Sequence, residues 1–242
     1  MPNIQLSQLQ KDILIFFGKN SFAGNFYLTG GTLLAYQYLH HRISVDLDFF
    51  SNDLFTDDQY LIFLNEFKSQ IKAKKITLTL QQNRRLCLIE RGGETVKIEL
   101  VYFPFPALEK KVFLPEFSLR VDSLTDIMVN KTLSSYQRQE PKDVFDLYCY
   151  LSPEGPRPFS EKSGAYGADN KPKYNLQKLI KLVERKFGVA VEPAVLLAKI
   201  NELAAQLDSL SPLLLVSQKN LTQKVKKFFQ NIFNSLVKKQ IK

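Results

Sequence analysis

Residues 28–52 have the sequence LTGGTLLAYQYLHHRISVDLDFFSN, which pairs a Gly-Gly-Thr turn with an Asp-x-Asp segment. Gly30 and Gly31 lie between an aromatic and apolar run and a helix-like run over residues 32–39. Glycine allows a sharp turn and lets a ligand approach the backbone amides, and Thr32 can cap the helix that follows. Because the free N–H groups of a helix N-terminus attract phosphate, the turn is a candidate phosphate-binding site.

The Asp-x-Asp segment lies within residues 45–50, a run that is typical of a strand. Side chains alternate between the two faces of a strand, so Asp46 and Asp48 are predicted to share one face and Val45, Leu47 and Phe49 the other. Two neighbouring carboxylates repel each other unless a cation lies between them, and Mg²⁺ takes oxygen ligands that it shares with substrate phosphates. Each motif alone is more often structural, but their order and spacing favour phosphoryl or nucleotidyl transfer.

These residues resemble a known family. The turn followed by His41-Arg42-x-Ser44-x-Asp46-Leu47-Asp48-Phe49-Phe50 is similar to the opening motif of the AbiEii/AbiGii-type toxin family, within the DNA polymerase β-like nucleotidyltransferase superfamily. The resemblance covers roughly the first 150 residues, about the size of one domain. It implies an α/β (α+β) fold, in which a mixed sheet flanked by helices precedes a C-terminal helical region.

The same resemblance implies a function. The protein would be the toxin of a two-component toxin–antitoxin system and would move a nucleoside monophosphate from a nucleoside triphosphate to an acceptor. The acceptor implied is RNA, including tRNA, and the partner implied is a cognate antitoxin protein. In this interpretation Gly30, Gly31 and Thr32 hold the triphosphate, and Asp46 and Asp48 bind one or two Mg²⁺ ions.

Three later residues have counterparts in that family. A third carboxylate usually joins the first two from a neighbouring strand, and Glu99 is the candidate metal ligand and proton acceptor; the family residue is usually Asp, and a surface Glu paired with Lys97 is the competing interpretation. Lys131 resembles the lysine that reaches the nucleotide phosphates. Asp143, in the segment Arg138…Lys142-Asp143-x-x-Asp146-Leu147, would belong to the active site, although a place in the first turn of a helix also accounts for its charge.

Two other functions remain open from the residues alone. Glu99 in place of Asp favours a nucleotide- or RNA-binding protein without turnover. Such a protein would use the same turn as a sensor, and a phosphotransferase that moves the terminal phosphate onto a protein is the third option. The chain has no Walker or dinucleotide-binding glycine pattern, and His40 with His41, lacking a third ligand, is weak evidence for zinc.

Composition is that of an ordinary globular protein, with 45% hydrophobic and 24% charged residues in 242. The net charge is +9, and seven lysines but no acidic residue follow Asp208, which leaves +2 for the rest of the chain. A basic tail favours a polyanionic partner, with a solvated helix face as the alternative. No apolar run is long enough to cross a membrane, no secretion signal precedes the first helix, and Cys87 and Cys149 are expected to be buried thiols of a cytoplasmic protein.

Periodicity and turn residues divide the remaining chain into elements. Residues 1–120 are predicted to form the α/β domain and residues 121–242 a helical domain, with a mobile Pro/Gly-rich loop at 152–172. Ser123 and Pro141 would start helices, Gly188 would end one and Pro193 would start the next. Helices are predicted at 4–19, 54–74, 124–136, 174–187, 193–207 and 218–239, strands at 76–81, 85–90 and 95–103, and a proline-punctuated connection at 104–115.

Overall fold

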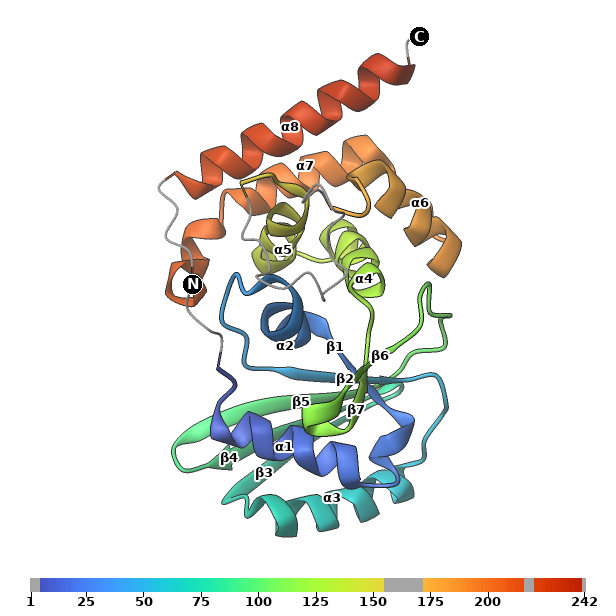
Figure 1. Ribbon diagram of the computed structural model, residues 1–242, viewed down its shortest axis with the longest axis vertical. Helices are drawn as coiled ribbons and strands as arrows, with labels where there is room; N and C mark the ends of the chain where they lie inside the picture. The colour runs from blue at the N-terminus through green and yellow to red at the C-terminus, as the bar shows by residue number, and fades with distance from the viewer. Residues whose placement is uncertain (1–4, 155–171, 216–219, 241–242) are drawn as a thin grey trace. The chain divides into compact units, whose positions relative to one another are not determined.

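The computed structural model describes residues 5–154, 172–215 and 220–240 of the chain (Figure 1). These residues form two compact units. The sheet unit comprises residues 5–36 and 44–123, and the helical unit comprises residues 37–43 and the described residues from 124 onward. The chain therefore leaves the sheet unit after Tyr36 and returns to it at Ser44, between the Gly-Gly-Thr turn and the Asp-x-Asp segment.

A mixed sheet is the centre of the sheet unit, as the sequence predicted. Over the described residues it has seven strands in the order β3-β4-β5-β2-β1-β7-β6. β2 pairs in parallel with β5 and antiparallel with β1, and β1 pairs in parallel with β7. The strands are β1 Tyr27–Thr29, β2 Leu47–Ser51, β3 Lys75–Gln81, β4 Arg84–Arg91, β5 Glu94–Tyr102, β6 Val112–Leu114 and β7 Leu119–Val121.

The three long strands β3, β4 and β5 match the strands predicted at 76–81, 85–90 and 95–103, and they pair as an antiparallel meander. Gly92 and Gly93 form the turn between β4 and β5 with φ values of +61° and +82°, a conformation that glycine adopts without steric cost. The short strands β6 and β7 were not predicted: β6 lies inside the expected proline-punctuated connection. Three-residue strands are too short to show an alternating pattern, so only their pairing partners define them.

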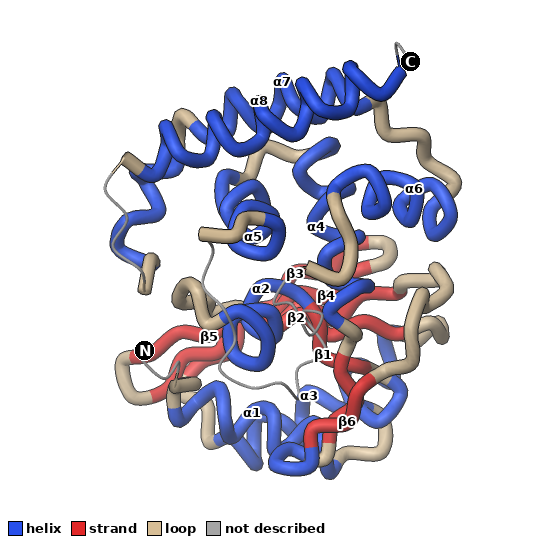
Figure 2. Tube along the Cα trace, turned by 45° about the horizontal axis from the view of Figure 1, so that its top comes forward, coloured by secondary structure: helices blue, strands red, loops and turns tan. Residues whose placement is uncertain are grey.

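Two helices pack against the sheet on one side (Figure 2), and each begins with a capping box. Ser7 caps α1 Gln8–Lys19, so this helix begins four residues later than predicted. Thr56 caps α3 Asp57–Ile71, which lies within the helix predicted at 54–74 and buries Tyr60, Phe63, Leu64, Phe67 and Ile71. Phe17 of α1 stacks on Phe49 of β2 with ring centroids 3.7 Å apart, so the core is centred beneath the strand that follows Asp46.

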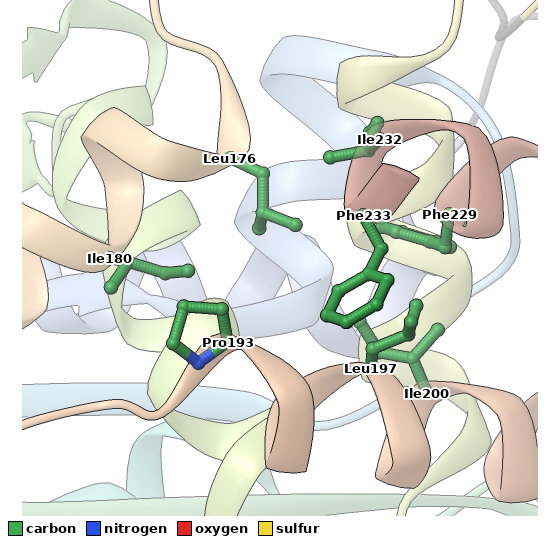
Figure 3. A pocket seen from close by; sticks show the side chains of 8 residues that line it. All are labelled: Leu176, Ile180, Pro193, Leu197, Ile200, Phe229, Ile232 and Phe233. Atoms are coloured by element: carbon green, nitrogen blue, oxygen red, sulfur yellow. The ribbon is translucent and has the colours of Figure 1, made fainter. Parts of the chain in front are cut away.

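Helices α4 Leu124–Gln137, α5 Pro141–Leu151, α6 Leu176–Phe187, α7 Pro193–Ala204 and α8 Leu221–Gln240 build the helical unit. Pro141 and Pro193 occupy first turns, and Gly188 ends α6 with a φ of +66°, as predicted. Leu221, Val225 and Phe229 of α8 are buried. A small apolar pocket remains where α6, α7 and α8 meet (Figure 3).

Several shorter elements connect these helices and strands. They are the helix α2 Gly30–Leu33, the π-helical turn Leu34–Leu39, and the 3₁₀ turns Ala23–Asn25, Pro115–Phe117 and Leu207–Leu213. Most of the predicted loop at 152–172 lies outside the described residues. Cys87 and Cys149 are buried free thiols, as predicted. None of the described helices has both the length and the apolar character needed to cross a membrane.

Candidate active site

The Gly-Gly-Thr turn lies directly against the second aspartate of the Asp-x-Asp segment. Thr29 is opposite Asp48 in the antiparallel β1–β2 pair, and the chain turns into α2 at Gly30 with a φ of +77°. A β-carbon placed on Gly30 would lie 2.0 Å from Oδ2 of Asp48. Both the backbone conformation and the close approach therefore require glycine at this position.

The turn also contacts the first aspartate, through Thr32. Its hydroxyl donates to the backbone carbonyl of Asp46, and the side chain is buried. The prediction that Thr32 caps the helix was wrong. The helix begins at Gly30 and has Thr29 at its N-cap position, so Thr32 already lies within the helix and its hydroxyl bonds a neighbouring segment instead.

The two aspartates differ in their backbone setting. β2 begins at Leu47, so Asp48 is inside the strand and Asp46 immediately precedes it. Leu47 and Phe49 are fully buried, as alternation predicted, whereas Val45 is 53% exposed. The predicted start of the strand was wrong: β2 begins two residues later than the apolar pattern indicated, so Val45 lies outside it.

Glu99 is the third carboxylate of this group. It lies opposite Asp48 in the parallel β2–β5 pair, and its side chain is 13% exposed. Nζ of Lys97 lies 3.0 Å from Oε1 of Glu99 and 2.9 Å from Oδ2 of Asp46. Nη1 of Arg84 lies 3.3 Å from the other oxygen, Oε2, of Glu99. The pairing of Glu99 with Lys97, which was the competing interpretation of Glu99, is therefore present. Lys97 also pairs with Asp46.

The Lys97 ammonium is held firmly in its charged form. Partial burial would lower its pKa, but hydrogen bonds and charge interactions with Asp46 and Glu99 outweigh burial and raise the pKa. The ammonium of Lys97 therefore joins Asp46 and Glu99, two of the three carboxylates that were predicted from the sequence to bind a metal ion.

The donor chemistry at this place suits a hard divalent cation. Asp46, Asp48 and Glu99 supply carboxylate oxygens, which Mg²⁺ prefers, and the Lys97 ammonium already stands between two of them. In the described part of the chain, no group of three or more His, Cys, Asp or Glu side chains is arranged to hold a metal ion as it stands. An ion bound by all three carboxylates would require the ammonium to move.

Lys131 and Asp143 come together in the helical unit, inside a buried charge cluster. Nζ of Lys131, on α4, lies 2.6 Å from Oδ1 of Asp143 and 2.8 Å from Oδ2 of Asp146, both on α5. Arg138 bonds the other oxygen of Asp143 at 2.7 Å. Asp143 and Asp146 share a face of α5, because residues three apart on a helix are neighbours, and neither has exposed surface.

Asp146 also holds the segment that leads to the Asp-x-Asp motif. Nε and Nη2 of Arg42 donate to its two oxygens at 2.7 and 3.0 Å, and Nε2 of His41 lies 2.6 Å from Oδ1. Arg42 and His41 are buried. His41 and Arg42 therefore stabilise the helical unit through their contacts with Asp146.

Burial and pairing act in opposite directions on the pKa values of this cluster. Burial alone would raise the pKa of Asp146, but Arg42 and Lys131 lower it well below its usual value. The pKa of Asp143 is lowered by Lys131 and Arg138 despite burial. The pKa of Lys131 is raised because its two carboxylates outweigh burial, and burial lowers the pKa of His41. Both aspartates and Lys131 are therefore charged, and His41 is neutral near pH 7.

The sequence matches the model of a protein family described as nucleotidyl transferase AbiEii toxin, type IV toxin–antitoxin system, over residues 14–231. The chain belongs to this AbiEii family. It is therefore a nucleotidyltransferase of a toxin–antitoxin family. A comparison of this sequence with curated proteins found no match.

Two crystal structures from Helicobacter pylori share the AbiEii-family fold seen here. The structure of JHP933 is 18% identical in sequence and superposes with a TM-score of 0.57, covering 98% of this chain and 97% of its own. A second, described as a candidate nucleotidyltransferase, is 17% identical with a TM-score of 0.57, covering 96% and 94%. At this identity the likeness concerns the fold.

In this AbiEii-family chain the predicted site residues fall into two groups, each brought together within its own unit. Gly30, Gly31, Thr32, Asp46, Asp48 and Glu99 belong to the sheet unit, and Lys131 and Asp143 to the helical unit. Sequence reasoning missed that Lys97 reaches Asp46 as well as Glu99, and it gave no role to Arg84. The signal for Lys97 was its spacing of two from Glu99, which places both on one face of β5.

Proposed function

We propose that this AbiEii-family protein transfers a nucleoside monophosphate from a nucleoside triphosphate to an acceptor hydroxyl, and that the reaction depends on Mg²⁺. The observation that carries the proposal is the double contact between the turn and the acid segment. Gly30 lies against the carboxylate of Asp48, and Thr32 bonds the carbonyl of Asp46. An anion at the turn would therefore lie beside the carboxylate of Asp48 and close to the main chain of Asp46.

Asp46, Asp48 and Glu99 would hold one or two Mg²⁺ ions. A bound ion would supply charge neutralisation at the α-phosphate and at the acceptor oxygen. The backbone N–H groups of Gly30 and Gly31 would bind phosphate oxygens at the start of α2. Glu99 would accept the proton of the attacking hydroxyl through Oε1, the oxygen that Lys97 contacts, once this ammonium moves aside, while Arg84 holds the other oxygen.

Lys131 and Asp143 are proposed to act from the helical unit. Lys131 would neutralise phosphate charge, and Asp143 would orient a substrate or a partner residue. In the free protein the Lys131 ammonium is buried and paired with Asp143 and Asp146, so contact with a phosphate would require it to leave one of these carboxylates.

The acceptor proposed is RNA, including tRNA. In α8 the lysines Lys224 and Lys227 are exposed while Val225 and Phe229 are buried, so the helix packs by its apolar face and presents positive charge on the other. Such a face suits the phosphate backbone. The partner proposed from the toxin–antitoxin family is a cognate antitoxin protein.

A transfer assay with labelled nucleotides tests the proposal. The full-length protein is incubated with Mg²⁺, total RNA or protein fractions, and each of the four triphosphates labelled at the α- or the γ-phosphate. Label on RNA only from the α position is expected, and label from the γ position would instead indicate a phosphotransferase. Asp46→Asn and Asp48→Asn should abolish transfer, whereas Asp58→Asn, an exposed acid in the first turn of α3, should not. Undiminished transfer by the first two variants would overturn the assignment.

A further inference from the structure

We propose that Lys97 is a resident counter-cation of the carboxylate group: it positions Asp46 and Glu99 in the metal-free protein and gives way when a divalent cation binds. The inference rests on the proposed function, because it concerns the same carboxylates. It assigns to Lys97 a positioning role and makes the protein's affinity for divalent cations depend on this residue.

The strand register places Lys97 at the centre of the group. Ile98 pairs with Leu47 and Glu99 with Asp48 in the parallel β2–β5 ladder. Lys97 is the next residue toward the start of β5, on the same face as Glu99, and Asp46 is the next residue before β2. The ammonium therefore reaches one carboxylate along its own strand and one across the sheet, at 3.0 and 2.9 Å.

Asp46 depends on this contact more than Glu99 does. Its side chain precedes β2, where the ladder no longer fixes the backbone, and only the carbonyl is held by Thr32. Glu99 has a second cation in Arg84. Among the described residues, Lys97 is the one cation paired with Asp46. Without Lys97, Asp46 would lose its ion pair and would repel Glu99.

The Lys97 ammonium must also weaken the binding of a metal ion to these carboxylates. It stands within hydrogen-bond distance of two of the three proposed ligands, and a unit positive charge a few ångströms away disfavours a second cation. Its side chain is 30% exposed, and a lysine stem is long and flexible, so the ammonium can turn aside without a change in the backbone. We therefore expect removal of the charge to tighten divalent-cation binding about tenfold.

Binding of Mn²⁺ to the full-length protein measures this directly, without reference to catalysis. Free Mn²⁺ is followed by its electron paramagnetic resonance signal, and the melting temperature is recorded with and without the ion. Lys97→Met keeps an unbranched side chain that is one atom shorter and removes the charge, and Lys97→Arg keeps the charge. Lys75→Met is the matched control, because Lys75 lies on the same sheet and pairs with Glu90 at 3.7 Å while 65% exposed.

The expected result is a specific pattern across the variants. Lys97→Met should bind Mn²⁺ about tenfold more tightly than the wild type, melt at a lower temperature without the ion, and gain more in melting temperature when the ion is added. Lys97→Arg and Lys75→Met should keep an affinity close to that of the wild type. Lys97→Gln replaces Lys97→Met if the latter does not fold.

An unchanged or weaker affinity in the folded Lys97→Met variant would overturn the role of Lys97. Asp48→Asn separates this failure from failure of the proposed function. If the wild type binds Mn²⁺, Asp48→Asn weakens binding and Lys97→Met changes nothing, Lys97 alone has been misassigned. If neither the wild type nor Lys97→Met binds Mn²⁺, or Asp48→Asn binds as the wild type does, the metal site of the proposed function fails and the role of Lys97 fails with it.

Discussion

Gly30 and Asp48 meet across the β1–β2 pair so closely that residue 30 has no room for a side chain. A β-carbon there would lie 2.0 Å from Oδ2 and 2.8 Å from Cγ of Asp48. The turn that begins α2 therefore packs directly on the second acid of the Asp-x-Asp segment, and a side chain added at residue 30 must displace Asp48.

Gly30→Ala should remove transfer activity while leaving the protein folded. The new methyl group must push Asp48 away, and a displacement of about 1 Å at a reacting centre costs on the order of 100-fold in rate. Gly93→Ala is the matched control, because Gly93 also has a positive φ, +82°, but no atom within 4 Å of an added β-carbon. Both variants should lose about 1 kcal/mol of stability from backbone strain. Equal activity in the two variants would contradict the role given to the Gly30–Asp48 contact.

Thr32→Val should reduce activity more than stability. The substitution keeps the shape of the side chain and removes the hydroxyl that donates to the carbonyl of Asp46. The expected loss is about 1 kcal/mol in the free energy of unfolding, with a fall in kcat as Asp46 becomes less fixed. Thr32→Ser, which retains the hydroxyl, should restore kcat, and failure of serine to do so would show that the bond to Asp46 is not what matters.

Asp146→Asn should strongly destabilise the helical unit. Asp146 pairs with Arg42, Lys131 and His41 and has no exposed surface. Loss of one partner from a buried charge pair costs about 3–5 kcal/mol. Asp57→Asn breaks a comparable pair with Arg85, but Asp57 is 56% exposed, and its loss should cost under about 1 kcal/mol. Urea unfolding of both variants at pH 7 measures the difference, and similar losses would contradict the inferred importance of burial.

The same cluster predicts how stability changes in acid. The pKa values of Asp143 and Asp146 are lowered in the folded protein because the cations beside them outweigh burial. An unfolded Asp takes up its proton near pH 4, so the unfolded state binds protons first as the pH falls. The stabilisation from these residues is therefore complete above about pH 4 and declines below it. Urea unfolding between pH 7 and pH 3 should show that the difference in the free energy of unfolding between the wild type and Asp146→Asn becomes smaller below pH 4. A constant difference would contradict the lowered pKa of Asp146.

The lysine face of α8 should determine how RNA binding depends on salt. Replacement of Lys224 and Lys227 by Ala should weaken binding of tRNA at low salt and reduce the slope of log affinity against log salt concentration by about 1 to 2. Lys178 and Lys181 of α6 have the same spacing and exposure, and their replacement by Ala is the control. Filter binding at several salt concentrations measures both slopes. If both double variants give the same slope as the wild type, α8 does not contact the RNA.

Much of the fold followed from the sequence because it depends on local patterns. The apolar spacing of α3, the alternation in β3 to β5 and the glycines at 92 and 93 each specify an element from residues that are neighbours in the chain. The mixed sheet and the family also followed, from the order of the Gly-Gly-Thr turn and the Asp-x-Asp segment.

Contacts between distant residues were decided by the tertiary structure alone. The hydroxyl of Thr32 bonds Asp46 instead of capping its helix, β6 and β7 exist only through their pairing, and Arg42 finds Asp146 more than a hundred residues away. The position of the Lys97 ammonium between Asp46 and Glu99 belongs to the same class. A residue's own sequence neighbourhood sets its backbone preference, but the partner of a buried polar or charged group depends on which strands and helices the folded chain brings beside it.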